Sequence, residues 1–327
     1  MKKAWLLTSP APQSHWYETW RFVGEMRRRG LDTIHINPSK WKMYGSELFI
    51  DGKKLEQPNT IMLRHAVWDT APLKQVQTFL DKGTFICNKL QPHIDALDKV
   101  TCHPKYIAAN IPTPKTEIID FNDDNAFDII DDKIGWPCVI KWRFAAGSER
   151  VYLCHNPEDA YAVARELINT HRGKIFRSKY SIGNTPIDQR IDLRMIVQEY
   201  LNLDYMFRVH AIRGKHILAN MQIHGLSLKG YDKFKGNFSS IGTDNPPDGR
   251  MTLSTKPTSE MKNLVEKILY ALDLEWGGID IFPTKNGLMV CEVNPTANIV
   301  MAEAASLKNI TGMMIDHMLE GYSSKIN

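Results

Sequence analysis

The sequence has few cysteines and no cysteine pattern typical of a metal site or a disulfide framework. Its 327 residues include five cysteines, with no C-x-x-C pair and no zinc-ligand spacing. Cys138, Cys154 and Cys291 lie in apolar strand-like runs, where a free cysteine packs as a small hydrophobic side chain. We therefore expect the cysteines to pack in the core and the protein to reside in a reducing cytoplasm.

Long hydrophobic runs and clustered basic residues are also missing. No stretch approaches the roughly 18 apolar residues that a membrane-spanning helix needs, and the apolar run near Met1 is far too short for a signal peptide. Lys and Arg number 41 against 37 Asp and Glu, and no stripe combines basic and aromatic residues. The sequence thus argues against membrane and nucleic-acid partners. A nucleotide or another anionic ligand explains the net charge of +4 at least as well.

The first 95 residues alternate strand and helix patterns. "KAWLLTS", "LDTIHINP", "NTIMLRH" and "TFICN" are typical of strands, and "WYETWRFVGEMRRRG" and "LKQVQTFLDKG" are typical of helices. This rhythm predicts a small parallel sheet in an α/β fold. "ELFIDGKKL" predicts a hairpin with an Asp-Gly turn. Trp16, Tyr17 and Trp20 at the first helix could recognise a peptide, but we expect them to pack in the core.

Two segments further along the chain break the regular pattern. Residues 171–192 are basic and rich in turn residues, which predicts a loop or hairpin insertion. Residues 225–250 form a long irregular excursion, the kind of loop that usually carries function. Helical patterns follow at residues 259–274 and 309–322.

A cluster of oxygen-bearing side chains lies in "WGGIDIFPTKNGLMVCEVNPTANIV", residues 276–300. Asp280 ends one strand pattern, and Glu292 and Asn294 lie two residues apart in the next, so they share a face of that strand. Three hard oxygen ligands from two neighbouring strands suit Mg²⁺ bound to a triphosphate. A lone Asp and Glu would favour a solvated sheet edge; the E-x-N spacing with a second acid favours a metal site.

Several motifs in a fixed order resemble the ATP-grasp ligases, in particular the RimK-type α-L-glutamate ligase and glutathione synthetase branch. The resemblance covers roughly residues 90–320 and rests on "ALDKVTCHPKYIAANIPTPKT", "PCVIKWRFAAGSERV", "IVQEYL", "FRVHAIRGKHILANM", "FKGNF" and "GIDI…EVNP". It implies an ATP-grasp fold with an N-terminal parallel α/β domain. The expected division is an N-terminal domain at residues 1–95, a central lobe with a flap at 96–200, and a C-terminal lobe with the metal site at 201–327.

The resemblance also implies a nucleotide site. The residues that match the family's ATP-binding positions are Lys99, Lys141, Gly147, Ser148, Gln198, Glu199, Leu201, Asp204 and Asn237. The flap "FAAGSERV" has one glycine where relatives have several, which makes close backbone approach to phosphate harder. Met206 replaces the family's ribose-binding acid, so we expect Asp204 to substitute, although a turn residue is an equally good reading of Asp204.

The same comparison implies three basic residues in catalysis. Lys235 replaces an arginine of the family, which keeps the charge but loses the bidentate fork. Arg208 would stabilise charge during phosphoryl transfer, and Arg64 would clamp a substrate carboxylate or an acyl phosphate. The alternative for Arg64, Lys99 and Lys141 is a position on the protein surface without a role in the site. His15 and His65 could line an acceptor pocket, whereas His210 is expected to pack within its strand.

The resemblance implies that ATP phosphorylates a carboxylate and that an amine displaces phosphate from the acyl phosphate, leaving an amide bond. The expected cofactors are ATP and Mg²⁺, with Mn²⁺ as an alternative, and the expected partner is an amino acid or a peptide. Family relatives are often dimers or tetramers, which makes a homo-oligomer one option, and the sequence leaves the oligomeric state open. One alternative is a peptide-modifying ligase that makes ester or amide crosslinks, with residues 171–190 as a basic docking surface. Another is a non-catalytic ATP-binding regulatory module.

Overall fold

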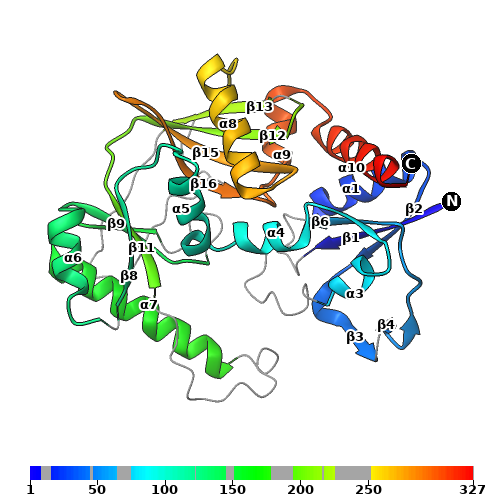
Figure 1. Cartoon of the computed structure of the whole chain (residues 1–327), viewed down its shortest axis with the longest axis horizontal. Coiled ribbons are helices and arrows are strands. Elements are labelled where there is room, and N and C mark those ends of the chain that lie inside the picture. The colour runs from blue at the N-terminus through cyan, green and yellow to red at the C-terminus, as the bar shows by residue number, and fades with distance from the viewer. Residues whose placement is uncertain are drawn as a thin grey trace.

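The computed structural model describes residues 1–8, 16–44, 47–64, 75–121, 123–144, 151–177, 194–215, 217–224 and 252–326. Within these ranges helices and strands are mixed, and the strands form four sheets. Figure 1 shows an N-terminal sheet, a central sheet flanked by two helices, and a C-terminal sheet, with α4 and α5 running between them. No helix in these ranges is long and apolar enough to cross a membrane. The predicted α/β fold class is confirmed.

The N-terminal region contains a parallel sheet with strand order β2-β1-β6-β7, which confirms the predicted β-α-β organisation. The predicted hairpin is also present: Asp51 and Gly52 both have positive φ, as a tight Asp-Gly turn requires. The elements are β1 (Lys2–Thr8), α1 (Trp16–Arg28), β2 (Leu31–Ile36), the 3-10 helix η2 (Pro38–Lys40), β3 (Trp41–Tyr44), β4 (Glu47–Ile50), β5 (Lys53–Lys54), β6 (Thr60–Arg64), α3 (Gln77–Leu80) and β7 (Phe85–Cys87).

The central region carries an antiparallel sheet with strand order β10-β9-β11-β8. Helices α6 and α7 pack against it through Ile130, Val163 and Leu167, which join the strands in one hydrophobic cluster. The elements are α4 (Leu90–Ala96), α5 (Lys99–Ala108), β8 (Thr116–Asp120), α6 (Ala126–Lys133), β9 (Cys138–Lys141), β10 (Val151–Cys154), α7 (Pro157–Arg177) and β11 (Arg194–Glu199).

The C-terminal region is built on an antiparallel sheet with strand order β14-β13-β12-β15-β16. The elements are β12 (Tyr205–Ile212), β13 (Ile217–His224), β14 (Thr252–Ser254), α8 (Ser259–Leu272), β15 (Trp276–Thr284), β16 (Gly287–Asn294), α9 (Val300–Ser306) and α10 (Ile310–Ile326). One face of this sheet packs on α8 and α5. Helix α10 lies beside α1 at the N-terminal sheet (Figure 1).

Two hydrophobic cores cross the boundaries predicted from the sequence. Leu6 and Phe22 share a cluster with Trp276 and Met314, so α10 packs as part of the N-terminal core. Tyr106 of α5 shares another cluster with Ile268 of α8. Asn88 adds a polar connection, because its side chain is hydrogen-bonded to backbone groups of the buried start of β15. The division at residues 95 and 200 stays a prediction.

Several local expectations were wrong. The helix predicted at residues 73–83 covers only Gln77–Leu80 among the described residues, and α7 extends to Arg177, into the predicted insertion. Residues 178–192 of that insertion and all of residues 225–250 lie outside the described ranges. Tyr17 and Trp20 do not pack in the core, since 63% and 55% of their surfaces are exposed. A helical period locates the buried face of α1, but large aromatic residues also occur on its outer face.

The cysteines are free thiols, and four of them are buried: Cys87, Cys102, Cys138 and Cys154. This confirms the expected core packing for those four. Cys291 differs because it is partly exposed and lines a cavity.

Gly278 on β15 is a position that the fold restricts to glycine. A methyl group there would lie 2.2 Å from Cβ of Ala297, in the loop after β16. We expect Gly278→Ala to lower the free energy of unfolding by about 1–3 kcal/mol, because the loop must shift. Gly24 on the exposed face of α1 is the matched control, since a methyl group there meets no atom within 4 Å. Gly24→Ala should raise stability by about 0.5–1 kcal/mol. Urea unfolding measures both, and equal effects would contradict this packing.

Candidate active site

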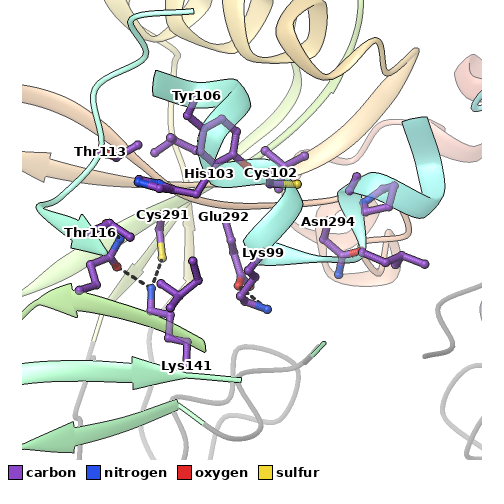
Figure 2. A pocket seen from close by; sticks show the side chains of 17 residues that line it. Lys99, Cys102, His103, Tyr106, Thr113, Thr116, Lys141, Cys291, Glu292 and Asn294 are labelled. Atoms are coloured by element: carbon purple, nitrogen blue, oxygen red, sulfur yellow. Dashed lines mark hydrogen bonds and ion pairs between the residues drawn. The ribbon is translucent and has the colours of Figure 1, made fainter. Parts of the chain in front are cut away.

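A cavity of about 50 Å³ lies between the central sheet, helix α5 and strand β16. Figure 2 shows side chains from all three converging on it. Lys99, His103 and Tyr106 reach it from α5, Thr116 and Lys141 from the central sheet, and Cys291, Glu292 and Asn294 from β16. The cavity therefore combines two cations, one carboxylate and several neutral polar groups from segments far apart in the chain.

A β-bulge interrupts the pairing of β15 with β16 where β16 borders this cavity. Asp280 is opposite Glu292 and Gly278 is opposite Asn294, but the register shifts after Asp280, so Cys291 has no partner residue on β15. A bulge breaks the alternation of a strand and re-aims its side chains. Cys291 and Glu292, although adjacent, both line the cavity, together with Val290 and Val293, which also belong to the hydrophobic cluster that includes α8. The expected shared face of Glu292 and Asn294 is confirmed.

Asp280 is buried and pairs with Arg208, its direct neighbour on β12. Nε and Nη2 of Arg208 each donate to one carboxylate oxygen of Asp280 over 2.7 Å, a bidentate geometry. Charge-assisted pairs of this kind are among the stronger hydrogen bonds in proteins. The structure thus brings together a predicted catalytic cation and a predicted metal ligand.

Glu292 lies close to cations from three other elements, α5, β9 and β12. Its carboxylate is 3.4 Å from Nζ of Lys99, the first residue of α5. Burial opposes ionisation of Glu292, but the charges of Lys99, Lys141 and Arg208 outweigh it, so the pKa of this carboxyl lies below its ordinary value. Asp98 caps α5 by accepting a hydrogen bond from the backbone of Val100, which fixes the start of the helix that carries Lys99.

Lys141 is buried at the end of β9, where its ammonium donates to Oε1 of Gln198 over 2.7 Å and lies 3.5 Å from Sγ of Cys291. Nε2 of Gln198 donates to Oγ1 of Thr116 over 2.9 Å. Gln198 therefore contributes its side chain to the cavity. Figure 2 shows the two contacts of Lys141 as dashed lines.

Three of the predicted ATP-binding residues do not line this cavity: Glu199, Leu201 and Asp204. The Glu199 carboxylate accepts a hydrogen bond from the backbone of Lys115, and Asp204 is exposed. His103, Tyr106 and Thr113 line the cavity although sequence reasoning missed them. The helical spacing of Lys99, His103 and Tyr106 could have found two of these, because residues four and seven positions after Lys99 share its face of the helix.

Arg64 is buried, so the alternative of a surface strand residue is wrong. Its guanidinium pairs with Glu18 of α1 and donates over 2.8 Å to the carbonyl of Ala297. It lines a second, smaller cavity together with His210, which packs within the sheet as expected. Burial and the charges of Arg208 and Arg64 lower the pKa of His210 to about 3, so this imidazole is neutral near pH 7.

Four predicted site residues lie outside the described ranges: Gly147 and Ser148 in the flap, and Lys235 and Asn237 in the long excursion. His15 and His65 also lie outside them.

The donor set of Asp280, Glu292 and Asn294 suits a hard cation. Asp280 and Glu292 are direct neighbours on β15 and β16, and Asn294 follows two residues after Glu292; Glu292 and Asn294 line the cavity, whereas Asp280 does not. Within the described ranges no group of three or more His, Cys, Asp or Glu residues is placed to hold a metal by itself. Two acids and an amide leave room for water and phosphate ligands, which Mg²⁺ commonly keeps.

Comparison with known proteins identifies the family of the chain. The family model described as "RimK-like ATP-grasp domain" matches residues 96–318, which include the whole cavity. The chain belongs to the RimK-like ATP-grasp family. This confirms the resemblance seen in the sequence motifs.

The individual proteins to which the chain is similar are distant in sequence but similar in extent. A probable alpha-L-glutamate ligase of Xylella fastidiosa is 23% identical, over 93% of this chain and 92% of that protein. The structure of the ATP-grasp ligase PsnB complexed with minimal precursor has a TM-score of 0.63 at 14% identity, covering 100% of this chain and 99% of PsnB. D-alanine–D-alanine ligase from Bacillus anthracis has a TM-score of 0.65 at 12% identity, covering 99% of this chain and 98% of that chain. The ATP-grasp fold is therefore shown across the chain.

The Arg208–Asp280 pair provides a test of the site's electrostatics. Arg208→Met would leave a buried carboxylate without its main cation, and we expect the free energy of unfolding to fall by about 3–5 kcal/mol. The double variant Arg208→Met with Asp280→Asn should recover most of that loss, because it removes both charges. Urea unfolding at neutral pH measures this. If the double variant were as unstable as the single one, the loss would come from packing rather than charge.

Proposed function

We propose that the protein is an ATP-dependent carboxylate–amine ligase that works through an acyl phosphate. One observation carries the proposal: Lys99 and Lys141 reach the cavity that Glu292 and Asn294 line from the C-terminal sheet. Cations on one side of a cavity and hard oxygen ligands on the other are what a metal-bound polyphosphate needs. Membership of the ATP-grasp family supports ATP as the nucleotide.

Mg²⁺ would be held by Asp280, Glu292 and Asn294, and when bound it neutralises charge on the phosphates. PsnB, a protein of the same fold, has been solved with Mg and ADP, which supports this choice of metal and nucleotide. Lys99 and Lys141 would contact the phosphates as compact charges. Gln198 would line the adenine side, with Glu199, Leu201 and Asp204 nearby on the connection between the sheets.

The reaction needs mainly positioning and charge neutralisation. The substrate carboxylate attacks the terminal phosphorus of ATP, the bond to the bridging oxygen breaks, and ADP leaves. The amine then attacks the acyl carbon, loses a proton and expels inorganic phosphate, leaving an amide. Arg208 lies beside the metal ligand Asp280, where it would stabilise negative charge during the transfer. Lys235, Asn237 and the flap residues Gly147 and Ser148 keep their predicted phosphate roles.

For the substrate we propose addition of an amino acid such as glutamate to a peptide or a small acceptor. The name probable alpha-L-glutamate ligase of several relatives supports this choice, including proteins of Xylella fastidiosa and Haemophilus influenzae. Arg64 would take part in holding a substrate carboxylate. Arg64 joins α1 to the loop after β16, so we expect it to shape the substrate side as well.

The second candidate is a ligase that crosslinks side chains within a precursor peptide by ester or amide bonds. The specific observation in its favour is the full-length structural similarity to PsnB, which was solved with a precursor peptide. Both candidates consume ATP and differ in the product.

The first experiment measures ADP release with Mg²⁺ while amino acids, dipeptides and peptides are screened as substrates, with product mass as the second readout. A glutamyl adduct supports our proposal. Loss of one water within a single peptide supports crosslinking. If the protein bound ATP but released no ADP with any of the substrates, the remaining interpretation would be a regulatory nucleotide-binding module.

A variant of Glu292 tests the metal site directly. We expect Glu292→Gln to lower the rate of ADP formation about 100-fold or more, because it removes a preorganised charge from the reacting centre. Glu56→Gln is the matched control on an exposed carboxylate that pairs with Lys3, and should keep the wild-type rate. Thermal unfolding confirms that both variants fold. Wild-type turnover by Glu292→Gln would remove our metal assignment.

A further inference from the structure

Three side chains and one backbone carbonyl form a continuous hydrogen-bond chain across the central sheet. Nζ of Lys141 on β9 donates to Gln198 on β11 over 2.7 Å, and Gln198 donates to Thr116 on β8 over 2.9 Å. The hydroxyl of Thr116 then donates to the carbonyl of Pro114 over 2.7 Å. Lys141, Gln198 and Thr116 all line the cavity of the candidate active site.

The chemistry of the groups fixes the direction of every bond in this chain. A carbonyl only accepts hydrogen bonds, so the single proton of the Thr116 hydroxyl goes to Pro114. The hydroxyl oxygen must then accept from Gln198, which turns the NH₂ group of that amide toward Thr116. The amide oxygen is therefore turned toward Lys141, whose ammonium has only donors. Both ends of the chain demand the same orientation of Gln198.

This orientation matters because Gln198 and Lys141 are buried, with exposed fractions of 5% and 6%. A buried amide with the opposite orientation would present its NH₂ group to an ammonium, and both groups would lose hydrogen bonds. Lys141 has three N–H donors, of which one is directed to Gln198 and one lies near Cys291. Holding two of them orients the third into the cavity.

We infer that Thr116 and Gln198 are positioning residues that aim the Lys141 ammonium at the phosphates of the bound nucleotide. The inference rests on the nucleotide site of the proposed function and assigns to it two residues that act through Lys141. Thr116 fixes the orientation of the Gln198 amide, and the amide oxygen in turn fixes the position of the Lys141 ammonium. This hydrogen-bond chain should leave the affinity for adenosine unchanged, because adenosine has no phosphate.

The experiment compares Thr116→Val, which removes the hydroxyl at nearly constant shape, with Thr116→Ser, which keeps it. Calorimetry of the full-length protein gives dissociation constants for adenosine, ADP and ATP in the presence of Mg²⁺. We expect Thr116→Val to weaken ADP and ATP binding about fivefold relative to adenosine, the effect of losing one hydrogen bond. Thr116→Ser should keep the wild-type ratio.

A second background isolates the role of Lys141. In a Lys141→Met protein, adding Thr116→Val should leave the ratio of ADP to adenosine affinity unchanged, because the hydrogen-bond chain no longer ends in a cation. If Thr116→Val weakened adenosine as much as ADP, or acted equally in the Lys141→Met background, Thr116 would shape the pocket wall and the inference would be overturned.

Crystal structures of the variants without nucleotide distinguish a failure of this inference from a failure of the proposed function. The contact between Lys141 and Gln198 should persist in Thr116→Ser and be lost in Thr116→Val. If it persisted in both variants, the inference that Thr116 positions Lys141 through Gln198 would be overturned. A wild-type protein that bound neither ADP nor ATP would contradict the proposed function. The variant structures would still show whether the contact between Lys141 and Gln198 depends on the Thr116 hydroxyl.

Discussion

Buried charges at the junction of the central and C-terminal sheets need partners of opposite sign, and this requirement organises the site. An unpaired ion in a protein interior costs several kcal/mol. Asp280 accepts hydrogen bonds from Nε and Nη2 of Arg208 on the adjacent strand, and Glu292 lies against Lys99 from a helix of another region. These pairs depend on the register of β12, β15 and β16, so the strand register and the electrostatics of the cavity support each other.

The bulge in β16 turns this arrangement into a site that can take a ligand. A regular strand would direct either Cys291 or Glu292 to the core. With the extra residue, both line the cavity beside Val290 and Val293, which also pack in the core. Strand β9 brings Lys141 from the other side, and the hydrogen-bond chain through Gln198 and Thr116 fixes it. Lys141 comes from the central sheet and Lys99 from helix α5, whereas the oxygen ligands come from the C-terminal sheet, which suits a site that binds a polyphosphate between them.

The sequence predicted the parts of this architecture that local patterns encode. Alternating strands and helices indicated the parallel N-terminal sheet, and the E-x-N spacing placed Glu292 and Asn294 on one face. It could not show the bulge, because one extra residue depends on pairing with β15. Nor could it show that Arg64 is buried, since its partners are Glu18 and a loop that lies more than 200 residues later. Side chains that contact distant segments, such as Asn88 and Thr116, have no signal in a single local window.

The central claim is that Asp280, Glu292 and Asn294 hold a metal that binds the phosphates of ATP between the two sheets. The most direct measurement is a crystal structure with Mn²⁺ and a non-hydrolysable ATP analogue, with the metal located by its anomalous scattering. The account predicts one anomalous peak coordinated by oxygens of these three residues and of the phosphates, with Lys99 and Lys141 in contact with the phosphates. An anomalous peak elsewhere, or phosphates bound outside this cavity, would contradict it.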